Sequence, residues 1–148
     1  MGSKNNNIPI KFRIRLISIS DLKPHENTDS IKLKSLKDEI FSDGILKRPI
    51  VIDEKTKVII DGHHRVDALR LLGCTKIPAC CVDYTCDKIG LKSNLENIKI
   101  TKDKVIEAAL NNCPFNPKST WHYIKLGNGI KHISFIQKRV DMPLETLK

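Results

Sequence analysis

The chain has 148 residues, a formal net charge of +9 at pH 7 and five cysteines. This length allows one compact domain, and the 40% hydrophobic and 29% charged residues provide a core, which excludes a disordered polyampholyte. No apolar run approaches the roughly 20 residues of a membrane helix, and residues 1–9 lack the apolar stretch of a secretory signal. We therefore expect a soluble, cytoplasmic protein without a membrane partner.

The cysteines indicate whether disulfide bonds are expected, and the cationic residues limit the kinds of binding partner. The odd number of cysteines, with Cys80 and Cys81 adjacent, favours reduced thiols over a secreted disulfide framework. The positive charge comes mostly from lysines scattered from Lys4 to Lys148. This dispersion favours a solvated surface over a nucleic-acid-binding stripe, while small anions fit equally well and nucleic acid stays open as a partner.

The chain opens with a strand and a helix. After a polar tail over residues 1–10, which we expect to be flexible, alternating apolar residues predict a strand over 11–19. A loop containing proline follows the strand. Asp29 or Ser30 is the expected N-cap of a helix that ends at Gly44.

The middle of the chain has the clearest pattern. Residues 49–53 and 57–61 predict two short buried strands joined by a polar turn. Residues 58–73 are the most organised passage, because they contain a strand end, a turn at Gly62, an amphipathic helix and a glycine stop. A further strand is predicted over 77–84.

The second half of the chain is less regular. Thr101 is the expected N-cap of a helix that reaches Asn111, with Ile100 packing against Val105. The remaining predictions are a polar loop over 113–122, a strand over 132–136 and a proline turn at Pro143. Together the elements predict an α/β or α+β fold, and its three parts are a tail over 1–10, a core over 11–84 and a C-terminal segment over 85–148.

The turn at Gly62 opens a helix whose first residues are His63, His64 and Arg65. A helix N-terminus presents unpaired N–H groups and a partial positive charge, so this turn suits a phosphate, and glycine lets the backbone come close. Cationic side chains are unfavourable there unless an anion compensates them, and that conflict is the strongest functional clue in the sequence. Asp61 ends the preceding strand and could hold Mg²⁺ that bridges phosphate oxygens.

These residues also have simpler interpretations. Asp61 could be the helix N-cap, with His63 and His64 as solvated first-turn residues. A zinc site is disfavoured, because adjacent side chains diverge on a helix and no cysteine pair has zinc-finger spacing.

Two loops carry further functional groups. Glu26 lies in a loop, where an exposed carboxylate is the ordinary outcome. The later loop offers a cation, two hydroxyls and an imidazole within five residues, a set suited to binding an oxyanion. These groups are Lys118, Ser119, Thr120 and His122. The alternative for the later loop is a polar turn with Trp121 packed into the core.

Residues 16–84 resemble the ParB N-terminal/sulfiredoxin superfamily, whose shared element is a strand, a turn with glycine and a basic helix that binds nucleotide phosphates. Sulfiredoxins carry a nucleophilic cysteine immediately before the His-Arg of this turn, where this chain has His63. Chromosome-partitioning ParB proteins have a Gly-Glu-Arg-Arg turn and continue into a DNA-binding domain. We expect no such domain here, because this sequence has too few residues after the turn. The resemblance implies a mixed sheet flanked by helices, with residues 11–84 as the nucleotide-binding core and 85–148 completing the substrate site.

The free L-serine kinases of this superfamily resemble the chain in three separated motifs. These are Lys23-Pro24-His25-Glu26, Asp61-Gly62-His63-His64-Arg65, and Pro117-Lys118-Ser119-Thr120 with His122. The resemblance implies a kinase that uses Mg²⁺ and ATP or ADP to phosphorylate the hydroxyl of free L-serine, giving O-phospho-L-serine. A ParB-like regulator that binds nucleotide, with or without DNA, and transfers no phosphate is the alternative.

The resemblance also implies a role for each residue. Glu26 would be the general base, and Asp61 would assist through the metal or the phosphoryl group. The nucleotide phosphates would be held by Gly62, His63, His64 and Arg65. The amino acid or its new phosphate would be held by His25, Lys118, Ser119, Thr120 and His122. Trp121 stands where the resemblance leads us to expect an arginine, so another small hydroxyl compound stays open as the acceptor.

Overall fold

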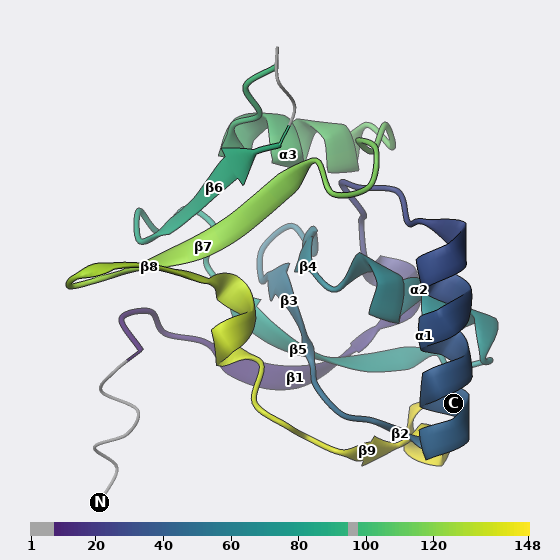
Figure 1. The fold of residues 1–148 in the computed structure, drawn as a ribbon. Helices are drawn as coiled ribbons and strands as arrows, with labels where there is room; N and C mark the ends of the chain where they lie inside the picture. The colour runs from purple at the N-terminus through teal and green to yellow at the C-terminus, as the bar shows by residue number, and fades with distance from the viewer. Residues whose placement is uncertain (1–7, 95–97) are drawn as a thin grey trace, which may run out of the picture.

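The computed structural model describes residues 8–94 and 98–148 (Figure 1), so most of the predicted tail over 1–10 lies outside the described residues. The elements are β1 (Arg13–Ser18), α1 (Ser30–Asp43), β2 (Ile45–Leu46), β3 (Ile50–Asp53), β4 (Ile59–Asp61), α2 (His63–Leu71), β5 (Lys76–Val82), β6 (Ile89–Ser93), α3 (Lys102–Leu110), β7 (Thr120–Leu126), β8 (Gly129–His132) and β9 (Met142–Pro143). The predicted mixed α/β class is confirmed.

The central sheet has the strand order β1-β5-β3-β4. Strand β5 pairs antiparallel with β1 and parallel with β3, and β3 pairs antiparallel with β4. Side chains alternate between the two faces of a strand. In β5, Ile77 and Ala79 therefore enter one hydrophobic cluster, while Cys80 and Val82 enter the other. Burial on both faces explains why these central strands are almost continuously apolar.

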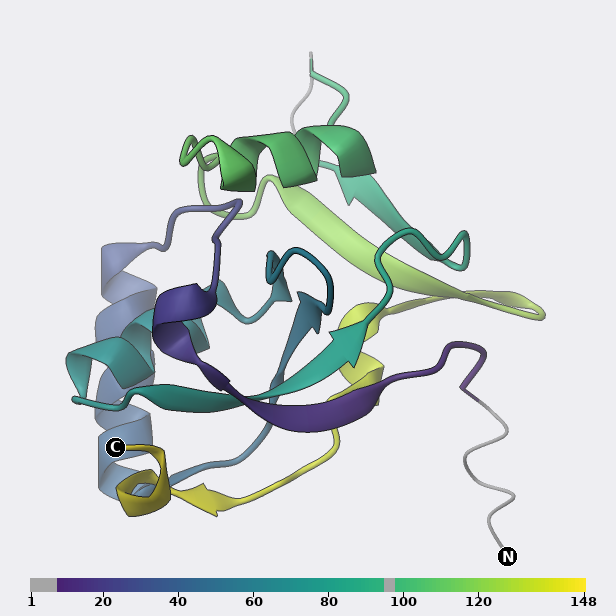
Figure 2. The ribbon, with the colours of Figure 1, turned by 180° about the vertical axis from the view of Figure 1, so that it is seen from behind.

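Each face of this sheet is covered by a different layer. Helices α1 and α2 pack on one face, and the second sheet, β6-β7-β8, packs on the other together with α3 (Figures 1 and 2). The C-terminal residues enter both layers, since Ile133 and Ile136 belong to one cluster and Leu144 and Leu147 to the other. The second half of the chain is therefore part of the core in its own right.

The helix boundaries follow the predicted capping residues. The Asp29 carboxylate accepts a hydrogen bond from the N–H of Ile31, and Gly44 ends α1 in the left-handed region, at φ 72°. The Thr101 hydroxyl accepts from the N–H of Lys104 at the start of α3. These three cap predictions are confirmed.

The predicted strand over 132–136 is wrong. Strand β8 ends at His132, and Ile133–Ile136 forms a 3₁₀ helix. The two isoleucines are three residues apart, which places both on the buried side of a helix with three residues per turn.

Strands β6 and β7 were not predicted, and β7 begins inside the predicted loop over 113–122. Burial in β7 alternates, with His122 and Ile124 inside. A histidine on the apolar side hid this period-two pattern from sequence analysis. Thr120 and His122 therefore lie on a strand and not in a loop.

No helix within residues 8–94 and 98–148 has the length and apolarity needed to cross a membrane. The five cysteines, all within this part of the chain, form no disulfide bond.

Candidate active site

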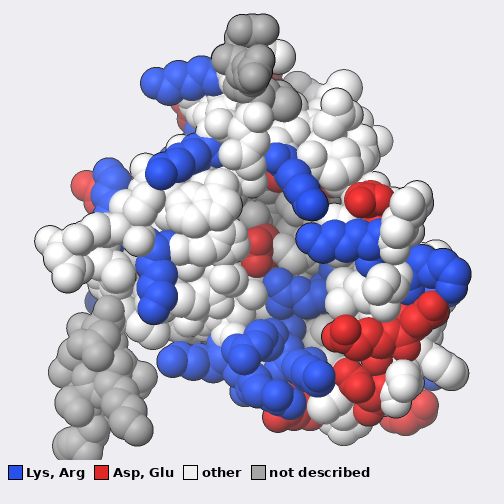
Figure 3. Space-filling model, in the orientation of Figure 1, with Lys and Arg blue, Asp and Glu red and all other residues white. Residues whose placement is uncertain are grey.

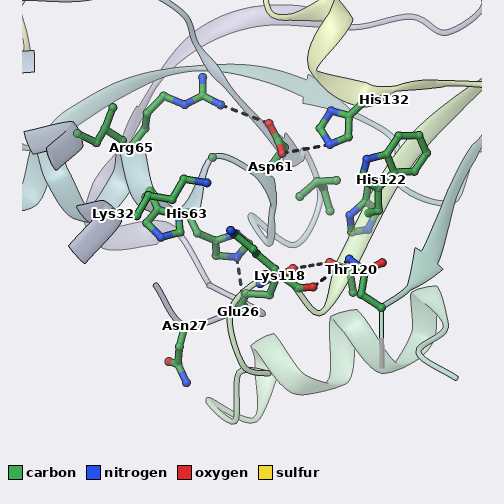
Figure 4. Close-up of a pocket in the computed structure, with 16 residues that line it drawn as sticks. Glu26, Asn27, Lys32, Asp61, His63, Arg65, Lys118, Thr120, His122 and His132 are labelled. Atoms are coloured by element: carbon green, nitrogen blue, oxygen red, sulfur yellow. Dashed lines mark hydrogen bonds and ion pairs between the residues drawn. The ribbon is translucent and has the colours of Figure 1, made fainter. Parts of the chain in front are cut away.

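A cavity of about 490 Å³ opens where the N-terminal end of α2 faces β7 and β8 (Figure 4). It brings together most of the predicted site residues from all three motifs. Those that line it are Glu26, Asp61, Gly62, His63, His64, Arg65, Lys118, Thr120 and His122. Two predicted residues, His25 and Ser119, do not line this cavity.

The Glu26 carboxylate is held in the wall of the cavity by the third motif. Its Oε1 accepts from the backbone N–H of Lys118 at 2.7 Å, and its Oε2 accepts from the Thr120 hydroxyl at 2.5 Å. Burial opposes ionisation of Glu26, but hydrogen bonds from His25, Thr120 and Lys118 outweigh it and lower the pKa of this carboxyl. Glu26 is therefore ionised at neutral pH and is not an ordinary exposed loop residue.

Two loops pair to bring Glu26 to this position. The N–H of Asn27 donates to the carbonyl of Phe115 at 2.8 Å, and the N–H of Phe115 donates to the carbonyl of His25 at 2.7 Å. This short parallel pairing sets the loop of the first motif beside the segment that leads into β7. A carboxylate and its partners, more than 90 positions apart, are thereby joined.

His25 lies behind the wall, with a side chain that is 0% exposed. Its Nδ1 donates to the carbonyl of Ile59 at 2.7 Å, and its Nε2 lies 3.1 Å from the Thr120 hydroxyl oxygen. Both ring nitrogens are therefore engaged by the protein. The expected substrate contact of His25 is not seen in this arrangement, because the ring faces protein atoms on both sides.

Position 62 accepts only glycine, because a side chain would be strained there and would collide with the core. Its φ of 109° is strained for any residue with a Cβ, and a Cβ built there would lie 2.4 Å from Cγ2 of Ile50 on β3. The close backbone approach predicted at this turn therefore occurs between Gly62 and the core residue Ile50. Gly62 is the N-cap of α2 without a side-chain cap, so the alternative in which Asp61 caps the helix is wrong.

The two histidines that follow hold the loop of Glu26 against α2. His63 Nε2 accepts from the N–H groups of His25 and Glu26, at 3.1 and 3.3 Å, and His64 Nε2 accepts from the N–H of Asp29 at 3.0 Å. Burial, followed by the nearby His25, lowers the pKa of His63 well below its usual value, and burial also lowers the pKa of His64. The prediction that these rings are positively charged is therefore wrong for His63, which is neutral.

Asp61 and Arg65 form a network at the floor of the cavity. Arg65 donates to Asp61 Oδ2 at 3.3 Å, to the carbonyl of Pro49 at 2.6 Å and to Gln137 Oε1 at 3.1 Å. Gln137 in turn donates to Asp61 Oδ2 at 2.7 Å. Burial lowers the pKa of Arg65, but a guanidinium with an aspartate partner stays charged. Asp61 Oδ1 takes no part in these bonds.

The third motif divides between the cavity and the core. Ser119 is buried outside the cavity lining, and its hydroxyl donates to the carbonyl of Asn116 at 2.5 Å. His122 lines the cavity with its Nε2 2.7 Å from the Tyr84 hydroxyl. Burial lowers the pKa of His122 well below its usual value, so this ring is neutral.

Sequence analysis missed His132, which lines the cavity, and Gln137, which bonds to Asp61. His132 Nε2 lies 4.0 Å from Asp61 Oδ1, while its Nδ1 accepts from the N–H of Ser134 at 3.1 Å. Trp121, the residue where arginine was expected, lies against the His132 ring at a centroid distance of 5.2 Å and lines the cavity.

Cations surround the mouth of the cavity. Figure 3 shows Lys and Arg side chains around a hollow on this face, with an acidic group at its floor. Among the residues that line the cavity, the Lys and Arg side chains are Lys32, Arg65 and Lys118, and the carboxylates are Glu26 and Asp61. A concave surface with this charge pattern attracts small anions.

The metal predicted at Asp61 can be tested against the donors that are present. No group of three or more His, Cys, Asp or Glu side chains in the described part of the chain could hold a metal ion by itself. Mg²⁺ commonly takes one or two carboxylates and completes its shell with phosphates and water. Asp61 Oδ1, which accepts no bond from Arg65 or Gln137 and has His132 Nε2 at 4.0 Å, would be the ligand for an ion of that kind, which a nucleotide would bring with it.

Comparison with known proteins places this geometry in a family. The model of the ParB N-terminal domain matches residues 2–98. An ATP-dependent L-serine kinase of Staphylothermus marinus is 33% identical over 105 residues, which cover 68% of this chain and 42% of that protein. An ADP-dependent L-serine kinase of Thermococcus kodakarensis is 27% identical over 95 residues, covering 62% and 39%. The chain spans about two fifths of the length of these curated relatives.

A solved structure supports the fold over a longer stretch. The structure of a free serine kinase in complex with AMP has a TM-score of 0.77 to this chain at 17% identity, covering 96% of this chain and 97% of that one. The second sheet and α3 are thus part of a known arrangement. On the family match, which extends over most of the sequence, the chain belongs to the ParB N-terminal domain family.

Proposed function

We propose that the protein is a kinase that transfers a phosphoryl group from ATP or ADP to the hydroxyl of free L-serine, giving O-phospho-L-serine. One observation supports the proposal most strongly. An ionised carboxylate, Glu26, is fixed by Lys118 and Thr120 in the wall of the cavity that also contains the N-terminal end of α2. A base and a phosphate site therefore share one cavity.

The nucleotide phosphates would lie at the first turn of α2. The N–H groups of His63, His64 and Arg65 precede the first intrahelical bond, which runs from Val66 to the carbonyl of Gly62 at 3.1 Å. Such N–H groups and the helix dipole favour an anion. The guanidinium of Arg65 adds fixed positive charge beside this turn.

The acceptor would bind on the opposite wall, against β7. The side chains of Lys118 and His122 line that wall next to Glu26. An ammonium group and a neutral imidazole suit the carboxylate of an amino acid or the phosphate of the product. Trp121 adds an apolar surface beside them, which limits the size of the acceptor.

Glu26 would orient the serine hydroxyl and accept its proton as the new O–P bond forms and the bond from the phosphorus to the leaving phosphate oxygen breaks. Each carboxylate oxygen has a second lone pair, so the bonds from Lys118 and Thr120 leave room for the substrate hydroxyl. Phosphoryl transfer depends mainly on positioning and charge neutralisation, and a weak base that is already ionised is sufficient. Mg²⁺ held by Asp61 would neutralise charge on the phosphates.

The test is to incubate the folded protein with Mg²⁺, L-serine and either ATP or ADP, and to search for O-phosphoserine by mass spectrometry. We expect product with one nucleotide and none when serine is omitted. Glycine, which lacks the hydroxyl, is the matched control acceptor. Absence of product with both nucleotides would reject the kinase.

A nucleotide-binding regulator without transfer activity is the second candidate. The family match and the net charge of +9 favour it, because a positively charged surface attracts a polyanion. For this candidate we expect salt-sensitive binding to duplex DNA, together with nucleotide binding that serine does not convert into turnover. Serine-dependent turnover without duplex binding would reject it.

A further inference from the structure

Three histidine rings pack together at the cavity wall, two of which line the cavity. The buried ring of His25 makes edge contacts with His63 and His122, at centroid distances of 4.6 and 5.5 Å. The Thr120 hydroxyl lies between His25 and the carboxylate of Glu26. Figure 4 shows Thr120 beside Glu26 at the cavity wall. Three adjacent imidazoles cannot all be charged in a buried place. Their hydrogen-bond partners decide which ring carries a proton on both nitrogens.

The partners of His63 and His122 keep these two rings neutral. His63 Nε2 accepts from two backbone N–H groups, and a nitrogen that accepts carries no proton. His122 Nε2 lies 2.7 Å from the hydroxyl of Tyr84, and burial lowers the pKa of His122 well below its usual value, so this ring is neutral whichever of the two groups donates. Both rings are thus neutral.

His25 has the opposite partners. Its Nδ1 faces the carbonyl oxygen of Ile59 at 2.7 Å, and a carbonyl only accepts, so Nδ1 carries a proton. Its Nε2 lies 3.1 Å from the Thr120 oxygen and 3.5 Å from Glu26 Oε2. Thr120 has one proton, which its 2.5 Å bond to Glu26 uses. Nε2 therefore faces a hydroxyl lone pair and a carboxylate oxygen, and only a protonated nitrogen satisfies both.

We propose that His25 is a buried imidazolium that pairs with Glu26 through Thr120 and keeps this carboxylate ionised. His25 does not line the cavity, so it is a positioning residue that acts through Glu26. The consequence for catalysis rests on the proposed function, in which Glu26 is the base. The charge of the ring is a property of the protein alone and can be measured without turnover.

The surroundings of His25 supply one compensating charge. The titratable or charged groups that face the ring are Glu26 on its own loop, His63 on α2, and His122 on β7 with Tyr84 behind it. Only Glu26 is an anion within this described set. A buried cation needs such a partner, and loss of the carboxylate leaves the ring charge without compensation.

The charge state can be read from nitrogen-15 spectra of the histidine rings in the wild-type protein at about pH 7.5. We expect the ring of His25 in the doubly protonated pattern and the rings of His63 and His122 in neutral patterns, as their surroundings require. We expect Glu26→Gln to convert that ring to the neutral pattern. Glu145→Gln, at a side chain that is 85% exposed, is the matched control and should leave it unchanged.

A neutral His25 ring in the folded wild-type protein would overturn the proposal, and so would an imidazolium at His25 that persists in Glu26→Gln. Because the first measurement needs no variant, a folding defect cannot obscure it.

Kinetics test the consequence for the base. In His25→Gln the carboxylate loses a neighbouring positive charge, so the pKa of Glu26 rises and the acidic limb of the pH–rate profile moves upward by about 1 pH unit. Glu145→Gln should leave the limb in place. An unmoved limb in a folded His25→Gln protein would overturn the consequence for catalysis. Absence of any turnover in the wild-type protein would instead reject the kinase and leave the spectra as the test of the ring charge.

Discussion

The two sides of the site are built in different ways. On the phosphate side, residues 61–65 are consecutive, and a strand end, a glycine turn and a helix start arrange them locally. On the acceptor side, Glu26 meets Thr120 across 94 positions of sequence, by way of two paired loops. The difference teaches that a binding turn can be encoded locally, whereas the ionisation of a base depends on the tertiary structure that surrounds it.

The largest expected effect is on the acceptor side. We expect Glu26→Gln to lower kcat by about 10² to 10⁴, the usual contribution of a general base, while the Kd for nucleotide changes by less than about twofold. The amide keeps the shape of the side chain, and its oxygen can still accept from the N–H of Lys118. Initial rates and calorimetric nucleotide titrations measure the two quantities.

Glu145→Gln makes the same chemical change at an exposed carboxylate and is expected to retain the wild-type kcat. A parallel loss of kcat and nucleotide affinity in Glu26→Gln would contradict the separation of the two sides.

The next effect is on the phosphate side. We expect Gly62→Ala to lower the free energy of unfolding by about 2–4 kcal/mol, because an L-residue is strained at φ 109° and the new methyl group would meet Ile50. Urea denaturation measures the change. Gly44→Ala is the matched control, since Gly44 also has a positive φ but has nothing within 4 Å of the added Cβ, and it should cost only about 1 kcal/mol. Equal losses in the two variants would show that the contact with Ile50 is unimportant.

Sequence patterns predicted the phosphate side better than the acceptor side for a physical reason. Caps and turns such as Asp29, Gly44 and Gly62 act within a few residues, so local spacing identifies them. The environment of Glu26 depends on contacts with the start of β7, a strand whose buried His122 concealed its alternation. The neutral state of His63 was equally hidden, because it results from backbone N–H groups 37 and 38 positions away.

A smaller effect concerns the link between His25 and Glu26. We expect Thr120→Val to lower kcat by about tenfold, because Glu26 Oε2 loses its hydroxyl donor while the β-branched shape that suits β7 is kept. Thr120→Ser restores the hydroxyl and should recover most of the loss. Steady-state rates of the two variants, compared at saturating nucleotide, measure the difference. If serine and valine at this position gave equal rates, the hydroxyl would have no part in holding the base.

The smallest effect is a difference in the pH dependence of stability. His122 is neutral in the folded protein because burial lowers its pKa well below 6.5, whereas in the unfolded chain it binds a proton below about pH 6.5. The unfolded state then binds more protons, so His122 makes the free energy of unfolding fall as the pH drops, by up to about 1.4 kcal/mol per pH unit. We expect His122→Gln, whose amide oxygen can accept from Tyr84, to reduce the loss between pH 6.5 and 5.5 by about 1 kcal/mol in urea titrations. An equal slope in wild-type protein and His122→Gln would mean that the folded protein admits a charged ring at this place in the wall.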